Sequence, residues 1–144
     1  MSAPTEGDAA RFEGAAVPLR VLVVDDEPAM LAVMTEALQV LGHAPTAAPS
    51  AAAALDALVD RGPYDAVLSD VGMPDMSGWE LAAIACAYDP TLPFIMMTGL
   101  GPDPPADVVS PNIRHVLSKP VDLALLQGLL RRLSGGEPPD TRPD

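Results

Sequence analysis

The stretch VLVVDDEP at residues 21–28 decides the fold. Its first half is a short, mostly β-branched apolar run, which predicts a buried strand at residues 21–24. The run ends abruptly in Asp25-Asp26-Glu27, and Pro28 then suits the first turn of a helix. A buried strand that leads directly into carboxylates and a helix is typical of a parallel α/β unit, with a polar site at the end of the strand.

The alternation of strand and helix continues outward from this stretch. We expect further strands at 43–48, 64–69, 94–97 and 113–117, and helices at 28–41, 50–60, 77–88 and 122–133. Ser50, Ser77 and Asp122 stand where N-caps are needed. The inward face of the first helix is predicted from apolar residues at helical spacing: Met30, Val33, Met34, Ala37, Leu38 and Leu41.

Residues 99–112 interrupt this pattern with four prolines and two glycines, so we expect the fourth helix to be short or degraded. The remaining pattern predicts an α/β fold of the (βα)5 type, with a parallel sheet and helices on both faces. We expect one domain at 19–133, a flexible leader at 1–18 and a flexible Gly/Pro tail at 134–144.

Composition narrows the function classes. The 144 residues include 8 Lys plus Arg against 20 Asp plus Glu, a net charge of −12. A field of this sign repels phosphate backbones and anionic lipid heads, so we expect no direct contact with nucleic acid or membrane. No apolar run is long enough to span a bilayer, and the start of the chain lacks a secretory signal. A cytoplasmic protein is the expectation.

Polar side chains stand at the ends of four predicted strands. Asp25 and Asp26 follow the first, Asp70 the third, Thr98 the fourth and Lys119 the fifth. Because the carboxyl ends of parallel strands share one edge, three carboxylates would repel one another there unless a cation lies between them. A site whose ligands are all oxygen atoms suits Mg2+. The hydroxyl of Thr98 and the amine of Lys119 beside it suit an incoming phosphoryl group. The pattern indicates phosphoryl transfer to a carboxylate.

These residues resemble the receiver domain of bacterial two-component response regulators, of the chemotaxis-regulator type. The resemblance covers residues 19–133 and rests on four motifs in the same order and spacing: VLVVDDEP (21–28), LSDVGMPDMSG (68–78), FIMMTG (94–99) and LSKP (117–120). It implies a doubly wound, flavodoxin-like fold with a five-stranded parallel sheet in the order 2-1-3-4-5.

The resemblance also implies roles for single residues. Asp70 is expected to accept the phosphoryl group from a histidine kinase or phosphotransfer protein. Thr98 and Lys119 are expected to contact the phosphoryl oxygens. Asp26 and Asp70 are expected to bind Mg2+ directly, Asp25 through water, and Gly72 through its backbone carbonyl. The peptide bond between Lys119 and Pro120 is expected to be cis.

The chain departs from the family in its proline-rich residues 99–112, because the fourth helix, fifth strand and fifth helix of the family usually form the output and dimer face. The family commonly has an aromatic residue three positions before the lysine, and here that position is Val116. The last predicted helix has more leucines than one buried stripe needs, which is compatible with a homodimer or with cover by residues 99–112.

Three alternatives stay open beside a phospho-accepting receiver that alters partner binding and is not an enzyme. The first is a pseudo-receiver, an interaction module that is not phosphorylated. The second is a receiver cut from a hybrid histidine kinase. The third is a phosphatase of the haloacid dehalogenase type, which disagrees with the sequence because it needs aspartates two positions apart, whereas Asp25 and Asp26 are adjacent.

Overall fold

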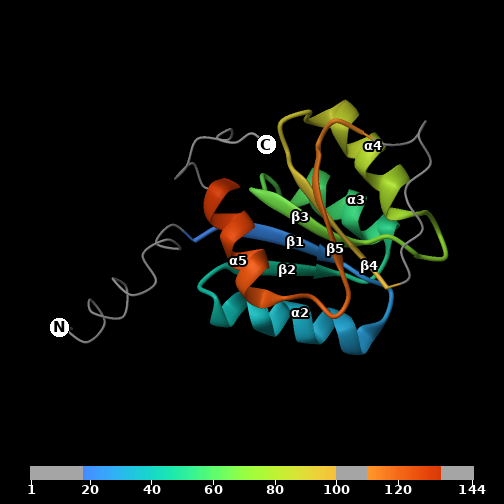
Figure 1. Ribbon diagram of the computed structural model, residues 1–144. Coiled ribbons are helices and arrows are strands. Elements are labelled where there is room, and N and C mark those ends of the chain that lie inside the picture. The colour runs from blue at the N-terminus through green and yellow to red at the C-terminus, as the bar shows by residue number, and fades with distance from the viewer. Residues whose placement is uncertain (1–17, 100–109, 134–144) are drawn as a thin grey trace.

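The computed structural model of the chain describes residues 18–99 and 110–133 (Figure 1). Its elements are β1 (Arg20–Val24), α2 (Pro28–Val40), β2 (Ala44–Ala48), α3 (Ala51–Asp60), β3 (Ala66–Asp70), α4 (Gly78–Tyr88), β4 (Phe94–Thr98), β5 (Ile113–Ser118) and α5 (Leu123–Arg131). Each expected strand and the four helices outside 99–112 correspond to one of these elements, with ends that differ by one or two residues.

The expectations for the leader, the tail and the degraded helix fall mostly outside this part of the chain. Residues 1–17, 100–109 and 134–144 are not described, so the structure does not test them. Among the described residues, no helix combines the length and the apolar character that a membrane crossing requires.

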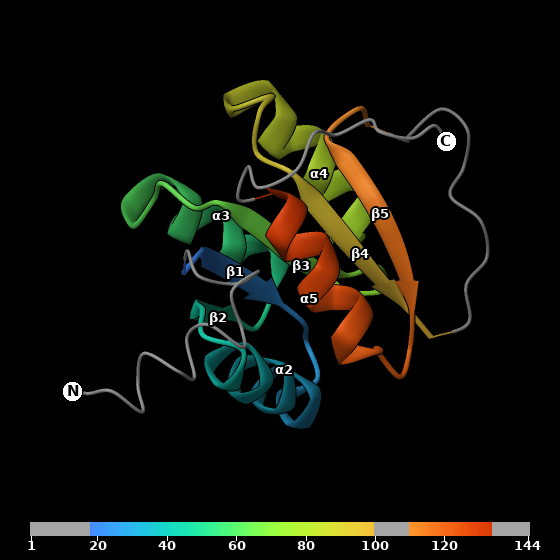
Figure 2. The same ribbon diagram turned by 60° about the vertical axis from the view of Figure 1, so that its left-hand side comes forward.

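The five strands form one parallel sheet in the order β2-β1-β3-β4-β5. One apolar cluster joins one face of the sheet to α3 and α4, and a second joins the opposite face to α2 and α5 (Figures 1 and 2). Successive residues of β1 contribute to opposite clusters, as Leu22 and Val23 show. A strand covered on both faces is apolar throughout. The fold is therefore the doubly wound, flavodoxin-like fold expected from the sequence.

The helices start where the sequence places caps. The Ser50 hydroxyl accepts a hydrogen bond from the Ala53 N–H at 3.0 Å at the start of α3. Ser77 and Glu80 form a reciprocal capping box at the start of α4, with both bonds at 3.1 Å. Asp122 accepts two backbone N–H groups at the start of α5. Each cap satisfies donors that the first helical turn leaves unpaired.

The buried face of α2 differs from the prediction. Met34 and Leu38 are buried, but Val33 is 57% exposed and does not face inward. Leu31 packs partly against the core instead. Adjacent helical residues point about 100° apart, so a stripe centred near Met34 and Leu38 excludes Val33. Spacing alone therefore predicted a face that was too wide.

The parallel arrangement brings the carboxyl ends of the strands to one edge of the sheet. Asp25 comes directly after β1, and Lys119 comes directly after β5. Asp70 is the last residue of β3, and Thr98 is the last residue of β4. The Lys119–Pro120 bond is cis, as expected, and Gly62–Pro63 is also cis. Side chains at this edge form the candidate functional site.

Candidate functional site

Three carboxylates meet at the carboxyl edge of the sheet. β1 pairs with β3 so that Val24 lies opposite Ser69, which brings the residues that follow them together. Asp25, Asp26 and Asp70 each place a carboxylate oxygen within 4.8 Å of the others. Asp25 and Asp70 are buried, whereas Asp26 is exposed. The site thus gathers negative charge at the boundary between the core and solvent.

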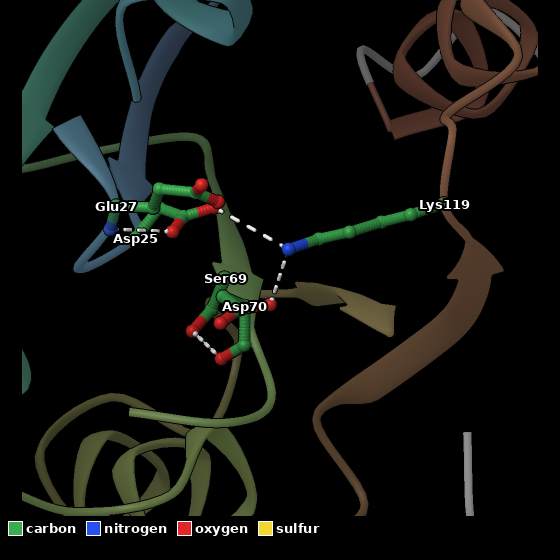
Figure 3. A network of polar contacts seen from close by, with 5 residues as sticks. All are labelled: Asp25, Glu27, Ser69, Asp70 and Lys119. Atoms are coloured by element: carbon green, nitrogen blue, oxygen red, sulfur yellow. Dashed lines mark hydrogen bonds and ion pairs between the residues drawn. The ribbon is translucent and has the colours of Figure 1, made fainter. Parts of the chain in front are cut away.

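Lys119 reaches across the edge of the sheet toward these carboxylates (Figure 3). Its Nζ lies 2.7 Å from Oδ1 of Asp70 and 3.6 Å from Oδ2 of Asp25. The backbone N–H of Lys119 donates to the Thr98 carbonyl at 2.9 Å, which fixes the base of the side chain to the end of β4. The lysine therefore connects the end of β5 to acidic residues on β3 and beyond β1.

The backbone orients the two oxygens of Asp25 differently. Oδ1 accepts a hydrogen bond from the Glu27 N–H at 2.9 Å (Figure 3). Oδ2 is buried and has no hydrogen bond within the described part of the chain, although Lys119 stands at ion-pair distance. The Asp25 N–H donates to the Ala48 carbonyl at 3.2 Å, which ties the residue to the end of β2.

The surroundings shift the pKa values of two of these groups. Burial raises the pKa of Asp25, and the charges of Asp70 and Asp26 add to this, while the Glu27 N–H and Lys119 lower it in part. Burial lowers the pKa of Lys119, but the hydrogen bond and charge of Asp70 and the charge of Asp25 outweigh burial and raise it. The lysine thus stays positive at neutral pH.

The donor set fits a hard divalent cation. The cluster contains three carboxylates and one lysine, so it keeps an excess of negative charge. The ligand atoms that the carboxylates offer to a metal are all oxygens. The buried Oδ2 of Asp25 also lacks a hydrogen-bond donor among the described residues. Mg2+ prefers oxygen ligands and one or two carboxylates together with water. These residues could therefore hold Mg2+.

Thr98 and Gly72 lie at the same edge of the sheet. Thr98 is the last residue of β4 and is half-buried. In the sheet it pairs with Ser118, the residue directly before Lys119. Gly72 is exposed, two residues beyond the end of β3. A Cβ atom at Gly72 would meet nothing within 4 Å, so the position does not require glycine for lack of space. Both residues therefore lie beside the site.

Gly78 is a supporting residue whose role the sequence did not reveal. A Cβ atom here would collide with the backbone carbonyl oxygen of Asp70 and lie 3.2 Å from Sδ of Met96. The Gly78 N–H donates to the Val71 carbonyl at 2.8 Å. Glycine is therefore needed for α4 to start against the end of β3. Its place after the cap residue Ser77 gave no sign of this contact.

The fold and the site define a class of doubly wound α/β proteins with three aspartates and a lysine at the carboxyl edge of the sheet. The family model of the response regulator receiver domain matches residues 21–131 of this chain. The chain belongs to this family, and the resemblance found in the sequence is confirmed.

Relatives and solved structures agree with the family. The chain is 35% identical over 109 residues to the response regulator receiver protein CpdR of Brucella abortus, covering 72% of this chain and 87% of CpdR. It is 32% identical over 126 residues to the response regulator protein FleR of Pseudomonas aeruginosa, covering 87% of this chain and 26% of FleR. The chain therefore spans only about a quarter of FleR.

Solved receiver domains share the fold. A CheY-like receiver domain protein of Methanospirillum hungatei superposes with a TM-score of 0.70 at 26% identity, covering 83% of this chain and 96% of that one. The response regulator protein TrrA of Thermotoga maritima, solved in complex with Mg2+ and BeF, superposes with a TM-score of 0.71 at 29% identity. That match covers 79% of this chain and 97% of TrrA.

Proposed function

We propose that this receiver domain accepts a phosphoryl group on Asp70 from a phosphorylated histidine of a histidine kinase or phosphotransfer protein. The observation that carries the proposal is the arrangement around Asp70. One of its oxygens lies 2.7 Å from Nζ of Lys119, and the carboxylates of Asp25 and Asp26 lie within 4.8 Å. A nucleophile, a fixed cation and a cation-binding carboxylate pair are the parts that phosphoryl transfer requires.

The chemistry follows from the positions of these groups. A carboxylate oxygen of Asp70 forms a bond to phosphorus while the P–N bond to the donor imidazole breaks, and the imidazole nitrogen keeps the electron pair. Lys119 neutralises the charge on one phosphoryl oxygen. The Thr98 hydroxyl donates a hydrogen bond to another phosphoryl oxygen. Little covalent assistance is needed, because positioning and charge neutralisation account for most of the catalysis in such reactions.

Mg2+ belongs to the same proposal. Asp26 and Asp70 would hold it directly, Asp25 through water, and Gly72 through its carbonyl oxygen. When bound, the ion supplies positive charge for the phosphoryl oxygens. The Mg2+ and BeF in the complex of the related TrrA support this assignment.

The test is intact-protein mass after incubation with acetyl phosphate, with and without Mg2+. We expect a single phosphoryl adduct that requires Mg2+ and is absent from Asp70→Asn. Asp89→Asn, which removes an exposed carboxylate at the opposite ends of the strands, should form the adduct like the wild type. An adduct that persists in Asp70→Asn would contradict the proposal, because another residue would then be the acceptor. No adduct from folded wild type would also contradict it and would favour the pseudo-receiver.

The phosphorylated state is proposed to alter the binding of a downstream protein in the cytoplasm. The domain then acts as a signalling module that promotes only its own phosphorylation and dephosphorylation. Val116 on β5 and Leu123 and Leu125 on α5 are 42%, 41% and 47% exposed, on the elements that the family uses for output. These exposed apolar side chains support a partner or a second copy as the reader of the signal.

A further inference from the structure

The loop between β3 and α4 is attached to the rest of the protein at both ends. At its start, the Val71 N–H donates to the Met97 carbonyl at 3.0 Å. At its end, the Gly78 N–H donates to the Val71 carbonyl at 2.8 Å. These bonds close the loop at its base, and further out Met73 and Met76 pack against the core. Gly72, which directly follows Val71, is the residue proposed to offer a carbonyl oxygen to Mg2+.

Asp75 attaches the outer part of the loop to a different element. Its carboxylate accepts hydrogen bonds from the first backbone N–H groups of α3, at 3.0 Å from Ala52 and 3.4 Å from Ala51. These N–H groups have no partner inside the helix, and the positive end of the helix dipole favours an anion there. The hydrogen bond from Ala52 is the largest cause of a lowered pKa for Asp75, so its side chain is anionic at neutral pH.

The start of α3 is already capped without Asp75. The Ser50 hydroxyl accepts the Ala53 N–H, which is the usual arrangement for a helix N-terminus. Asp75 comes from 23 residues further along the chain to take the next free donor, Ala52. Its contact therefore joins two elements, rather than completing a cap within one.

The same corner of the fold also holds Asp25. The Asp25 N–H donates to the Ala48 carbonyl at the end of β2, two residues before the Ser50 cap. The turn at residues 48–52 thus contacts both acidic segments, one through the backbone of Asp25 and the other through the carboxylate of Asp75. It is a shared support for the Asp25-Asp26 pair and for the loop beyond Asp70.

We infer that Asp75 is a positioning residue for the Mg2+ and phosphoryl site, because it ties the loop that carries Gly72 to the turn that holds Asp25. The inference rests on the proposed function of that site. Asp75 itself is exposed and touches neither phosphoryl group nor metal in this role. Without it, the loop keeps its closed base and the packing of Met73 and Met76 against the core, but loses its hydrogen bonds to the start of α3.

Mg2+ affinity measured by isothermal titration calorimetry tests this role. We expect Asp75→Ala to weaken Mg2+ binding about tenfold, the lower end of the range for outer partners of metal ligands. Asp75→Asn keeps an acceptor oxygen for Ala52 and should remain within about threefold of the wild type. Both variants lose the same charge, so the difference between them reports the hydrogen bond rather than the electric field.

Ser50→Ala provides the matched structural control. It removes the other cap of α3 and should lower the free energy of unfolding by about 1 kcal/mol, roughly a fivefold change in the folding equilibrium. It does not touch the loop, so the Mg2+ affinity should stay within twofold of the wild type. If Ser50→Ala weakens Mg2+ binding as much as Asp75→Ala does, the effect comes from α3 stability and the inference fails.

The remaining outcomes separate this inference from the proposed function. If wild type binds Mg2+ and forms the acetyl-phosphate adduct but Asp75→Ala binds Mg2+ equally well, the inference alone is wrong. Equal losses in Asp75→Asn and Asp75→Ala would also overturn it, because charge would then explain the effect. If folded wild type neither binds Mg2+ nor forms the adduct, the proposed function fails and the positioning role fails with it.

Discussion

At the scale of one residue, the charged form of buried Asp25 lowers the stability of the folded protein. Its carboxylate is 1% exposed and stands within 4.8 Å of two other carboxylates, and burial raises its pKa. The unfolded chain releases this proton near pH 4, whereas the folded protein holds it to a higher pH. In that interval the folded state binds more protons, so stability falls as the pH rises.

The prediction is a pH-dependent gain from Asp25→Asn. In metal-free protein, we expect the stability of the variant relative to wild type to increase from about pH 4 toward neutral pH. Urea unfolding with chelator across this range measures it. Asp89→Asn is a control of opposite sign, because the Thr91 hydroxyl and N–H lower the pKa of Asp89 and its contribution is lost in acid. A flat difference for Asp25→Asn would contradict the prediction.

His43 is a second residue whose role depends on distant partners. Its Nδ1 accepts the Leu19 N–H at 3.0 Å, and its Nε2 contacts Oε1 of Gln127 at 2.9 Å. The ring therefore joins the residue before β1, the start of β2 and α5.

We expect His43→Ala to lower the free energy of unfolding by about 2–4 kcal/mol, since it leaves a buried N–H unpaired and opens a cavity. Chemical denaturation measures this loss, and amide exchange at Leu19 should accelerate. His115→Ala, at an exposed position on β5, should change stability by less than about 0.5 kcal/mol. Equal effects of the two variants would mean that the buried contacts of His43 contribute little.

At the scale of elements, two glycines near helices should respond in opposite ways to the same substitution. Gly78→Ala introduces a methyl group against the backbone of Asp70, whereas a Cβ at Gly128 in α5 meets nothing within 4 Å. We expect Gly78→Ala to destabilise by about 1–3 kcal/mol and Gly128→Ala to stabilise by about 0.5–1 kcal/mol. Paired denaturation curves measure both, and a gain for Gly78→Ala would disprove the proposed close contact.

Local signals predicted the elements themselves well. The strands were found from short apolar runs, and the helix starts from Ser50, Ser77 and Asp122, because such caps act within three residues of themselves. The face of α2 was misjudged at Val33, since the direction of the stripe depends on which part of the sheet the helix packs against. Periodicity gives the existence of an amphipathic face, but packing sets its centre.

At the scale of the whole molecule, the strand order brought together the acidic residues that the sequence had singled out. Asp25, Asp26, Asp70 and Lys119 could be predicted as a group because each stands at a strand end of a parallel sheet. The contact of Asp75 with α3 and that of His43 with Gln127 could not, since they join residues 23 and 84 positions apart by side-chain geometry. The sequence contains no motif for either contact.

The net charge of −12 gives the last prediction, because it separates two ways in which Mg2+ can stabilise this protein. Any salt screens the general repulsion, whereas a bound ion also relieves the repulsion among Asp25, Asp26 and Asp70. At matched ionic strength, we expect Mg2+ at ten times its dissociation constant to add about 1.4 kcal/mol to the free energy of unfolding beyond the effect of NaCl.

Asp26→Asn should abolish this extra stabilisation, since it removes an exposed carboxylate of the group and leaves buried Asp25 and Asp70 in place. The variant should still be stabilised by salt screening, because removing one negative charge from −12 leaves a net charge of −11. Thermal unfolding with Mg2+, with NaCl at equal ionic strength and with chelator measures both parts. If NaCl and Mg2+ stabilise the wild type equally, the ion acts only through screening, and the carboxylates at the edge of the sheet do not form a cation site.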